Sequence, residues 1–143
     1  MNCPRCKTAL TPKIYEANIE VDTCATCGGL WLDKGELERI EETIEHDYSA
    51  SLSAPENVVA RTYEMANQSA RPDIDCPKCV QKMTKTECHP ASLIVVDLCD
   101  SCAGIWLDRG EIQALETYYE RLRQEERKEA KRGFFRGLRG LFG

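Results

Sequence analysis

Hydrophobic and polar positions alternate with a helical period in three stretches of the chain. The two stronger stripes are Leu37, Ile40 and Ile44, and Ile112, Leu115, Tyr119 and Leu122. Apolar residues that recur every three or four positions are typical of an amphipathic helix with one face on a core. Residues 55–67 begin with a proline and carry a weaker apolar stripe, which predicts a short helix there.

Two further stretches have the composition of β-strands. Residues 13–22 contain Ile14, Ile19 and Val21 between polar positions, and residues 93–97 read LIVVD. Branched apolar residues in short runs favour strands. Each stretch lies between two pairs of cysteines, so an antiparallel hairpin is predicted within each segment.

The chain contains an internal repeat. Cys3-Pro4-Arg5-Cys6 returns as Cys76-Pro77-Lys78-Cys79 at an offset of 73 residues, and WLDKGE at 31–36 returns as WLDRGE at 106–111 at an offset of 75. Eight of the nine cysteines thereby form two sets of paired C-x2-C motifs. The sets are Cys3, Cys6, Cys24 and Cys27, and Cys76, Cys79, Cys99 and Cys102.

Two C-x2-C pairs at this separation predict a tetrahedral Zn²⁺ site in each copy. Four thiolates leave no open position for a substrate, which favours a structural metal over a catalytic one. Iron is the alternative, because thiolate tetrahedra also accept iron. Each copy is too short for a good core of its own, and a bound zinc contributes about 10–16 kcal/mol at neutral pH.

The WLDxGE phrase fits a helix start. Asp33 with Glu36, and Asp108 with Glu111, are predicted to form capping boxes, in which case neither pair is free for acid–base catalysis. Trp31 and Trp106 are predicted to pack across the hairpin, under the new helix, and to cover the metal site. Exposed indoles that stack on a base or a partner are the alternative. Gly35 and Gly110 are predicted to admit a close approach of the indole or the hairpin backbone.

The order C-P-x-C, then C-x2-C, a glycine and W-L-D-x-G-E, resembles the zinc-ribbon family named after transcription factor IIB. The resemblance covers residues 3–40, the first ribbon, and residues 76–115, the second ribbon. It implies antiparallel strands and one zinc per copy, hence a small, metal-stabilised α+β fold of two ribbons, each followed by a helix. The family name suggests transcription.

Charge is distributed unevenly along the chain. Residues 1–126 carry 13 basic and 23 acidic side chains, a net charge of −10, whereas residues 127–143 carry six basic and one acidic. An acidic body is poorly suited to a phosphate backbone, so nucleic acid is not expected to bind residues 1–126. The basic end has one apolar stripe of helical period with arginines beside it, which predicts partner contacts. The positions concerned are Phe134, Phe135, Arg136, Leu138, Arg139, Leu141 and Phe142.

These patterns predict four segments. The first ribbon and its helix occupy 1–48, a linker with a short helix 49–75, the second ribbon and a longer helix 76–126, and a basic amphipathic end 127–143. The longer helix loses its apolar stripe after Leu122, so fraying is expected there. The terminal segment is expected to dock on its own ribbons, on a protein partner or a second copy, or on an anionic membrane surface.

The function expected from these segments is that of a non-enzymatic adaptor. The absence of a secretory pattern in MNCPRC, and of any apolar run of about 18–20 residues, predicts a cytoplasmic protein with reduced thiols. The alternatives are a transcription-associated or nucleic-acid-binding factor and a peripheral membrane protein. Cys88 and His89, in the longer second hairpin, are either further ligands or incidental.

Overall fold

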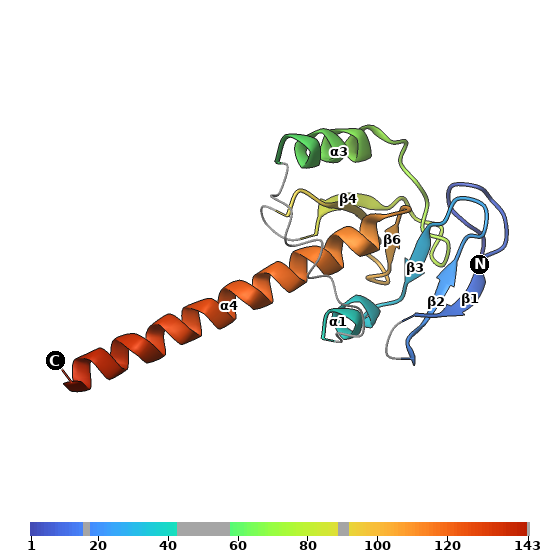
Figure 1. Cartoon of the computed structure of the whole chain (residues 1–143). Helices are drawn as coiled ribbons and strands as arrows, with labels where there is room; N and C mark the ends of the chain where they lie inside the picture. The colour runs from blue at the N-terminus through green and yellow to red at the C-terminus, as the bar shows by residue number, and fades with distance from the viewer. Residues whose placement is uncertain (16–17, 43–57, 89–91, 143) are drawn as a thin grey trace.

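The computed structural model describes residues 1–15, 18–42, 58–88 and 92–142. Its centre is a six-stranded antiparallel sheet with the order β1-β2-β3-β6-β5-β4 (Figure 1). The strands are β1 (Thr11–Ile14), β2 (Glu20–Thr23), β3 (Leu30–Leu32), β4 (Thr84–Glu87), β5 (Val95–Leu98) and β6 (Ile105–Leu107). The helices are α1 (Glu36–Glu41), α3 (Val58–Ala70) and α4 (Glu111–Phe142).

Each ribbon supplies three strands, and the two ribbons join into one sheet through β3 and β6. These strands are the Trp-Leu residues of the repeated phrase, and Trp31 lies opposite Trp106 in their antiparallel pairing. The strand order reads the same from both edges, so the two ribbons are related by an approximate two-fold axis at this pair. The hairpins were predicted, but β3 and β6 were not, because three residues carry too little alternation to identify a strand.

The two faces of the sheet carry different cores. Successive side chains of a strand point to opposite faces. On β3, Leu32 joins the aliphatic core under α1 and α4, and Trp31 joins the cysteines on the other side. Of the predicted helical stripes, Leu37, Ile40, Ile112, Leu115 and Tyr119 are confirmed as parts of the aliphatic core, whereas Leu122 is exposed.

The helix α4 contacts both the first ribbon and the helix that follows it. The Tyr15 hydroxyl, beside the first hairpin, donates to Oε2 of Glu116 on α4 at 3.0 Å. The Arg123 guanidinium on α4 donates to the Glu41 carbonyl at the end of α1. The ribbons and their helices therefore form one interlocked body.

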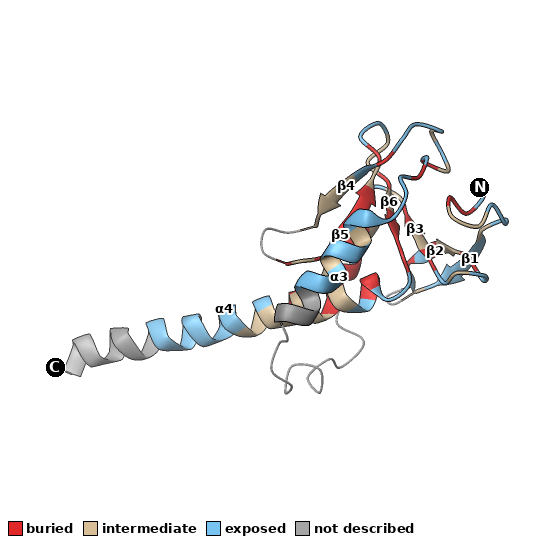
Figure 2. Cartoon of the chain, turned by 90° about the horizontal axis from the view of Figure 1, so that it is seen from above, coloured by how far each residue is buried: buried red, intermediate tan, exposed pale blue. Residues whose placement is uncertain are grey.

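The long helix α4 differs from the prediction. It continues without interruption through Phe142, where fraying was expected after Leu122, and residues 125–133 are exposed (Figure 2). Figure 1 shows its C-terminal half leaving the sheet, so the expectation that this end docks on its own ribbons is wrong for the described backbone.

The other two helices lie close to their predicted places. α3 runs from Val58 to Ala70, three residues past the predicted end at 67, while residues 55–57 of the predicted helix lie outside the described part of the chain. α1 is described to Glu41, while Ile44, the rest of the predicted helix to residue 48 and the start of the linker lie outside the described residues. No described helix is long and apolar enough to cross a membrane.

Candidate metal centres

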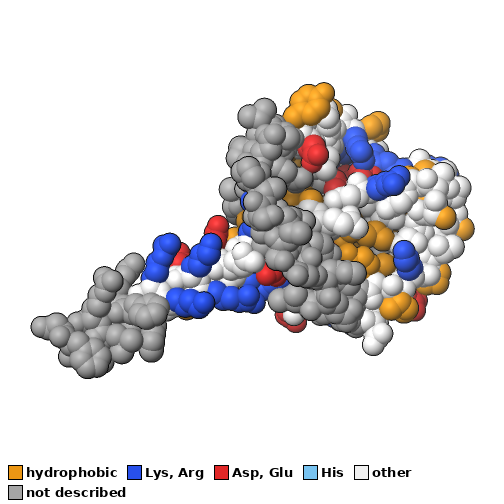
Figure 3. All heavy atoms as spheres, in the orientation of Figure 1, with side chains coloured by type: hydrophobic (Ala, Val, Ile, Leu, Met, Phe, Trp, Pro, Cys, Tyr) orange, Lys and Arg blue, Asp and Glu red, His pale blue; other side chains and the backbone are white. Residues whose placement is uncertain are grey.

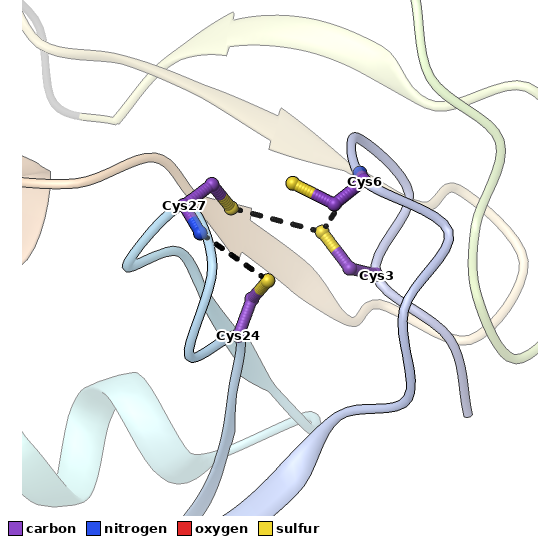
Figure 4. A group of neighbouring side chains, drawn as sticks. All are labelled: Cys3, Cys6, Cys24 and Cys27. Atoms are coloured by element: carbon purple, nitrogen blue, oxygen red, sulfur yellow. Dashed lines mark hydrogen bonds between the residues drawn. The ribbon is translucent and has the colours of Figure 1, made fainter.

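The two predicted cysteine sets each gather into one cluster. The four sulfur atoms of each set lie within 4.8 Å of one another (Figure 4 shows the first set). Sγ of Cys3 lies 3.7 Å from Sγ of Cys27, and Sγ of Cys76 lies 3.8 Å from Sγ of Cys102. A zinc tetrahedron with Zn–S bonds of ~2.3 Å has edges of about 3.8 Å. The spacing therefore fits one zinc ion in each cluster, and no described cysteine is in a disulfide.

Backbone N–H groups point at the first sulfur of each cysteine pair. The N–H groups of Arg5 and Cys6 donate to Sγ of Cys3 at 3.4 and 3.2 Å. The same contact recurs between Cys79 N–H and Sγ of Cys76 at 3.2 Å. Hydrogen bonds to sulfur favour the thiolate, which is the form that binds metal.

The second pair of each set contains a thiol that ionises readily. Burial alone would raise the pKa of Cys24, but N–H groups of Cys27 and Thr26 and the Thr8 hydroxyl lower it to about 6. Burial likewise opposes ionisation of Cys99, and the corresponding N–H groups lower its pKa to about 7. Burial and the neighbouring thiols instead raise the pKa of Cys27 and of Cys76 to about 12, so without a metal the ionised thiol of each cluster is mainly Cys24 or Cys99.

The turns that close the second cysteine pairs use left-handed residues. Gly28 has φ +75° and Ala103 has φ +60°. The glycine one position later is needed because an indole ring lies against it. A Cβ atom on Gly29 would lie 2.1 Å from the Trp106 ring, and one on Gly104 would lie 2.2 Å from the Trp31 ring.

Each indole thus crosses the two-fold axis and packs on the cysteine turn of the other ribbon. Trp31 and Trp106 are fully buried, which rules out exposed stacking aromatics. They cover the metal clusters as predicted, but they lie on the face away from α1 and α4. Nothing lies within 4 Å of a Cβ built on Gly35 or Gly110, so the predicted close approach is wrong there. Their φ angles of +88° and +87° explain these glycines instead.

The predicted capping boxes form only in part. Oε2 of Glu36 accepts the Asp33 N–H at 2.8 Å, and Oε2 of Glu111 accepts the Asp108 N–H at 2.7 Å. The aspartate side chains do not cap, since Gly35 is the N-cap of α1 and makes no side-chain bond. Oδ1 of Asp33 instead accepts the Trp31 indole N–H at 3.2 Å, and Asp108 holds Trp106 in the same way at 3.0 Å.

Asp108 is also the centre of an ion-pair network that sequence reasoning missed. Nε and Nη2 of Arg5 donate to its two carboxylate oxygens at 3.0 and 3.1 Å, and Arg71 pairs with it at 2.9 Å. Burial alone would raise the pKa of Asp108, but Arg5 and the Trp106 indole hold it below its usual value. Arg5 sits between two ligands of the first ribbon, so the network ties that ligand turn to the second ribbon.

The two-fold axis repeats this contact in a weaker form. Lys78, at the position equivalent to Arg5, reaches Oδ1 of Asp33 at 3.3 Å, and both side chains are largely exposed. The sequence signal was present, since both C-P-x-C motifs carry a basic residue at x and both phrases carry an aspartate. Only the three-dimensional pairing shows that each basic residue belongs to the aspartate of the other copy.

The ninth cysteine lies apart from both metal clusters. Cys88 packs against the aliphatic core, with its sulfur 3.8 Å from the Tyr119 hydroxyl. Burial raises the pKa of Cys88, which keeps this thiol neutral. It is not a metal ligand of either described cluster, and His89 lies outside the described residues.

Comparison with known proteins gives one match. The zinc-ribbon family of the transcription factor IIB type, described as a transcription factor zinc-finger, matches residues 2–43 and 75–117. No curated protein and no solved structure matches the chain. The two matched stretches include both four-cysteine clusters and cover more than half of the chain. The chain therefore belongs to the transcription factor IIB-type zinc-ribbon family and is a zinc-binding scaffold of two tandem ribbons with one zinc site in each.

Proposed function

We propose that this protein is a non-enzymatic adaptor whose ribbons form a rigid base and whose α4 helix carries a docking end. The observation behind the proposal is the shape of α4. The helix is anchored on the sheet by Ile112, Leu115 and Tyr119, which are buried, and then continues to Phe142, with residues 125–133 exposed. A helix that leaves its own core is suited to contact something else.

The metal clusters support a structural role rather than a catalytic one. Each sulfur set fills a tetrahedron, so a bound zinc has no position left for a substrate or a reactive water. The carboxylates next to the clusters are also engaged. Asp108 binds Arg5, Arg71 and the Trp106 indole, while Glu111 accepts the Asp108 N–H.

The test compares the full chain with a variant lacking residues 133–143. Captured proteins are identified by mass spectrometry, and direct binding is then measured with the purified partner. We expect the deletion to abolish capture while zinc content and the melting temperature of the body remain unchanged. Tyr63→Ala is the matched control, because Tyr63 is an exposed aromatic on α3, away from the docking end. Identical capture by the deletion variant, together with unchanged oligomeric mass and unchanged binding to lipid vesicles, would refute the docking role.

A transcription-associated role is the second candidate, because the matching family is described as a transcription factor zinc-finger. The net charge of −10 on residues 1–126 opposes contacts with phosphates. A gel-shift titration of the full chain at physiological salt separates the candidates. Sequence-specific sub-micromolar binding that survives deletion of residues 133–143 would favour transcription over the adaptor role.

A further inference from the structure

We infer that the receiver of the α4 docking end is an anionic lipid surface. This inference rests on the proposed docking role and deepens it. The docking end is defined as residues 133–143, and the helical stalk as residues 124–132.

The stalk and the docking end together present an unbalanced positive charge. Residues 124–143 contain six basic side chains and three acidic, a net charge of +3, and the described basic residues of the stalk are exposed. Figure 3 shows lysines and arginines gathered along this helix. Clustered basic residues on an amphipathic helix are attracted to anionic lipids.

The sequence of the docking end also provides an apolar side. Its five large apolar residues recur at i, i+1, i+4, i+7 and i+8, and the backbone is helical through Phe142. In an α-helix these positions share one face. Short helices with phenylalanine and leucine on one face and arginine beside it lie in the interfacial layer of a membrane. They need no preformed groove.

Two hollows on the described body are alternative receivers in a second copy, and both are unsuitable. The larger, of about 600 Å³, lies between the first hairpin and the start of α4. Lys13, Asp108 and Arg109 line it, so it offers no net negative charge to a basic segment. The smaller, of about 280 Å³, lies between α3 and α4 and is lined by Arg71 and Arg109 together with Glu64 and Glu111.

The stalk is long enough to hold the acidic body away from an anionic surface. The acidic body would be repelled by an anionic surface that attracts the docking end. Nine helical residues at 1.5 Å each span about 14 Å. This exceeds the screening length of about 8 Å at physiological salt. Gly133 separates the stalk from the docking end and has open space around it, so the helix can bend there.

The experiment is co-sedimentation of the purified zinc-loaded full chain with vesicles. Vesicles of phosphatidylcholine alone are compared with vesicles that also contain phosphatidylserine. We expect binding to the anionic vesicles only, with at least a tenfold loss of affinity on deletion of residues 133–143. A double variant Phe135→Ser, Leu138→Ser keeps the charge and is expected to lose most of the binding. Tyr63→Ala is expected to bind like the wild type.

Full-length protein that fails to sediment with anionic vesicles, or sediments equally with neutral ones, would overturn the inference. A larger oligomeric mass that depends on residues 133–143 would then identify a second copy as the receiver and leave the docking role intact. If the deletion also left the captured proteins and the oligomeric mass unchanged, the proposed function itself would be wrong.

Discussion

Trp31 and Gly104 belong to different ribbons and lie in contact, since a Cβ atom on Gly104 would be 2.2 Å from the indole. Gly104→Ala is expected to destabilise the protein by at least about 3 kcal/mol, because the closed core has no space for a methyl group. Gly29→Ala is expected to behave alike against Trp106. Denaturant unfolding of zinc-loaded protein measures both effects.

Two glycines outside this contact are matched controls for the substitution itself. Gly110→Ala has open space but a left-handed backbone, so about 1–2 kcal/mol is expected. Gly133→Ala, on the exposed helix with open space, is expected to cause no loss. Equal losses at Gly104 and Gly110 would show that backbone conformation, rather than the indole, governs position 104.

The reciprocal indoles predict that the two zinc sites depend on each other. Each indole packs two residues beyond the last cysteine of the other ribbon, so loss of one metal loosens the turn that holds the second. Native mass spectrometry during titration with a chelator is expected to show two-zinc and metal-free protein, with one-zinc protein below its statistical share. Trp31→Leu is expected to raise the one-zinc fraction. Accumulation of a stable one-zinc species in the wild type would contradict this coupling.

The two aspartates related by the two-fold axis are expected to differ in importance. Asp108→Asn keeps an acceptor for the Trp106 indole but leaves the mostly buried Arg5 with only the longer ion pair to Asp97 at 3.5 Å. A loss of about 2–4 kcal/mol is expected in the free energy of unfolding, slightly below the range for fully buried pairs. Asp33→Asn disrupts only an exposed pair with Lys78 and is expected to change little. Equal losses of stability in the two variants would show that the ion-pair network around Asp108 does not stabilise the protein.

Glu111 is expected to make the stability of the protein depend on pH between about 4.5 and about 8. Burial, and then the charge of Asp108, raise the pKa of Glu111 from 4.5 to about 8, although the Asp108 N–H lowers it. The folded protein therefore keeps a proton that the unfolded chain has lost, so this residue makes stability fall as pH rises from about 4.5 to about 8.

Glu111→Gln keeps an oxygen that accepts the Asp108 N–H and removes the titration. We expect it to flatten the stability curve between about pH 6 and about pH 8 in denaturant titrations with zinc present, and to be more stable than the wild type at the upper end. Glu36→Gln, at the less buried equivalent position, is expected to have a smaller effect. An unchanged curve for Glu111→Gln would exclude this carboxyl as the source.

The features that the sequence predicted correctly depend on short-range spacing. A C-x2-C pair closes its own turn, so both ligand sets followed from the repeat. The stripes through Leu37 and Ile112 likewise follow from helical geometry alone. The helix start was half right, because Glu36 and Glu111 bind the predicted N–H groups, but an indole two residues upstream occupies each aspartate.

Contacts across the two-fold axis were beyond sequence reasoning. The pairing of Trp31 with Trp106 joins residues 75 positions apart, and no local period specifies it. Arg5 likewise finds Asp108 only because β3 and β6 adjoin. The continuous helix through residues 123–132 was missed because its charges surround the axis, which removes the apolar stripe without removing helix propensity.

The approximate two-fold axis also bears on how many docking ends one molecule carries. Two identical ribbons assembled around such an axis as separate chains would bear two identical docking ends. Here both halves are joined covalently, and the basic apolar segment 133–143 occurs once, after the second ribbon. In the proposed function the protein thus offers one docking end for two zinc sites, at a stoichiometry independent of its concentration. Any avidity for its receiver must therefore come from clustering of whole molecules.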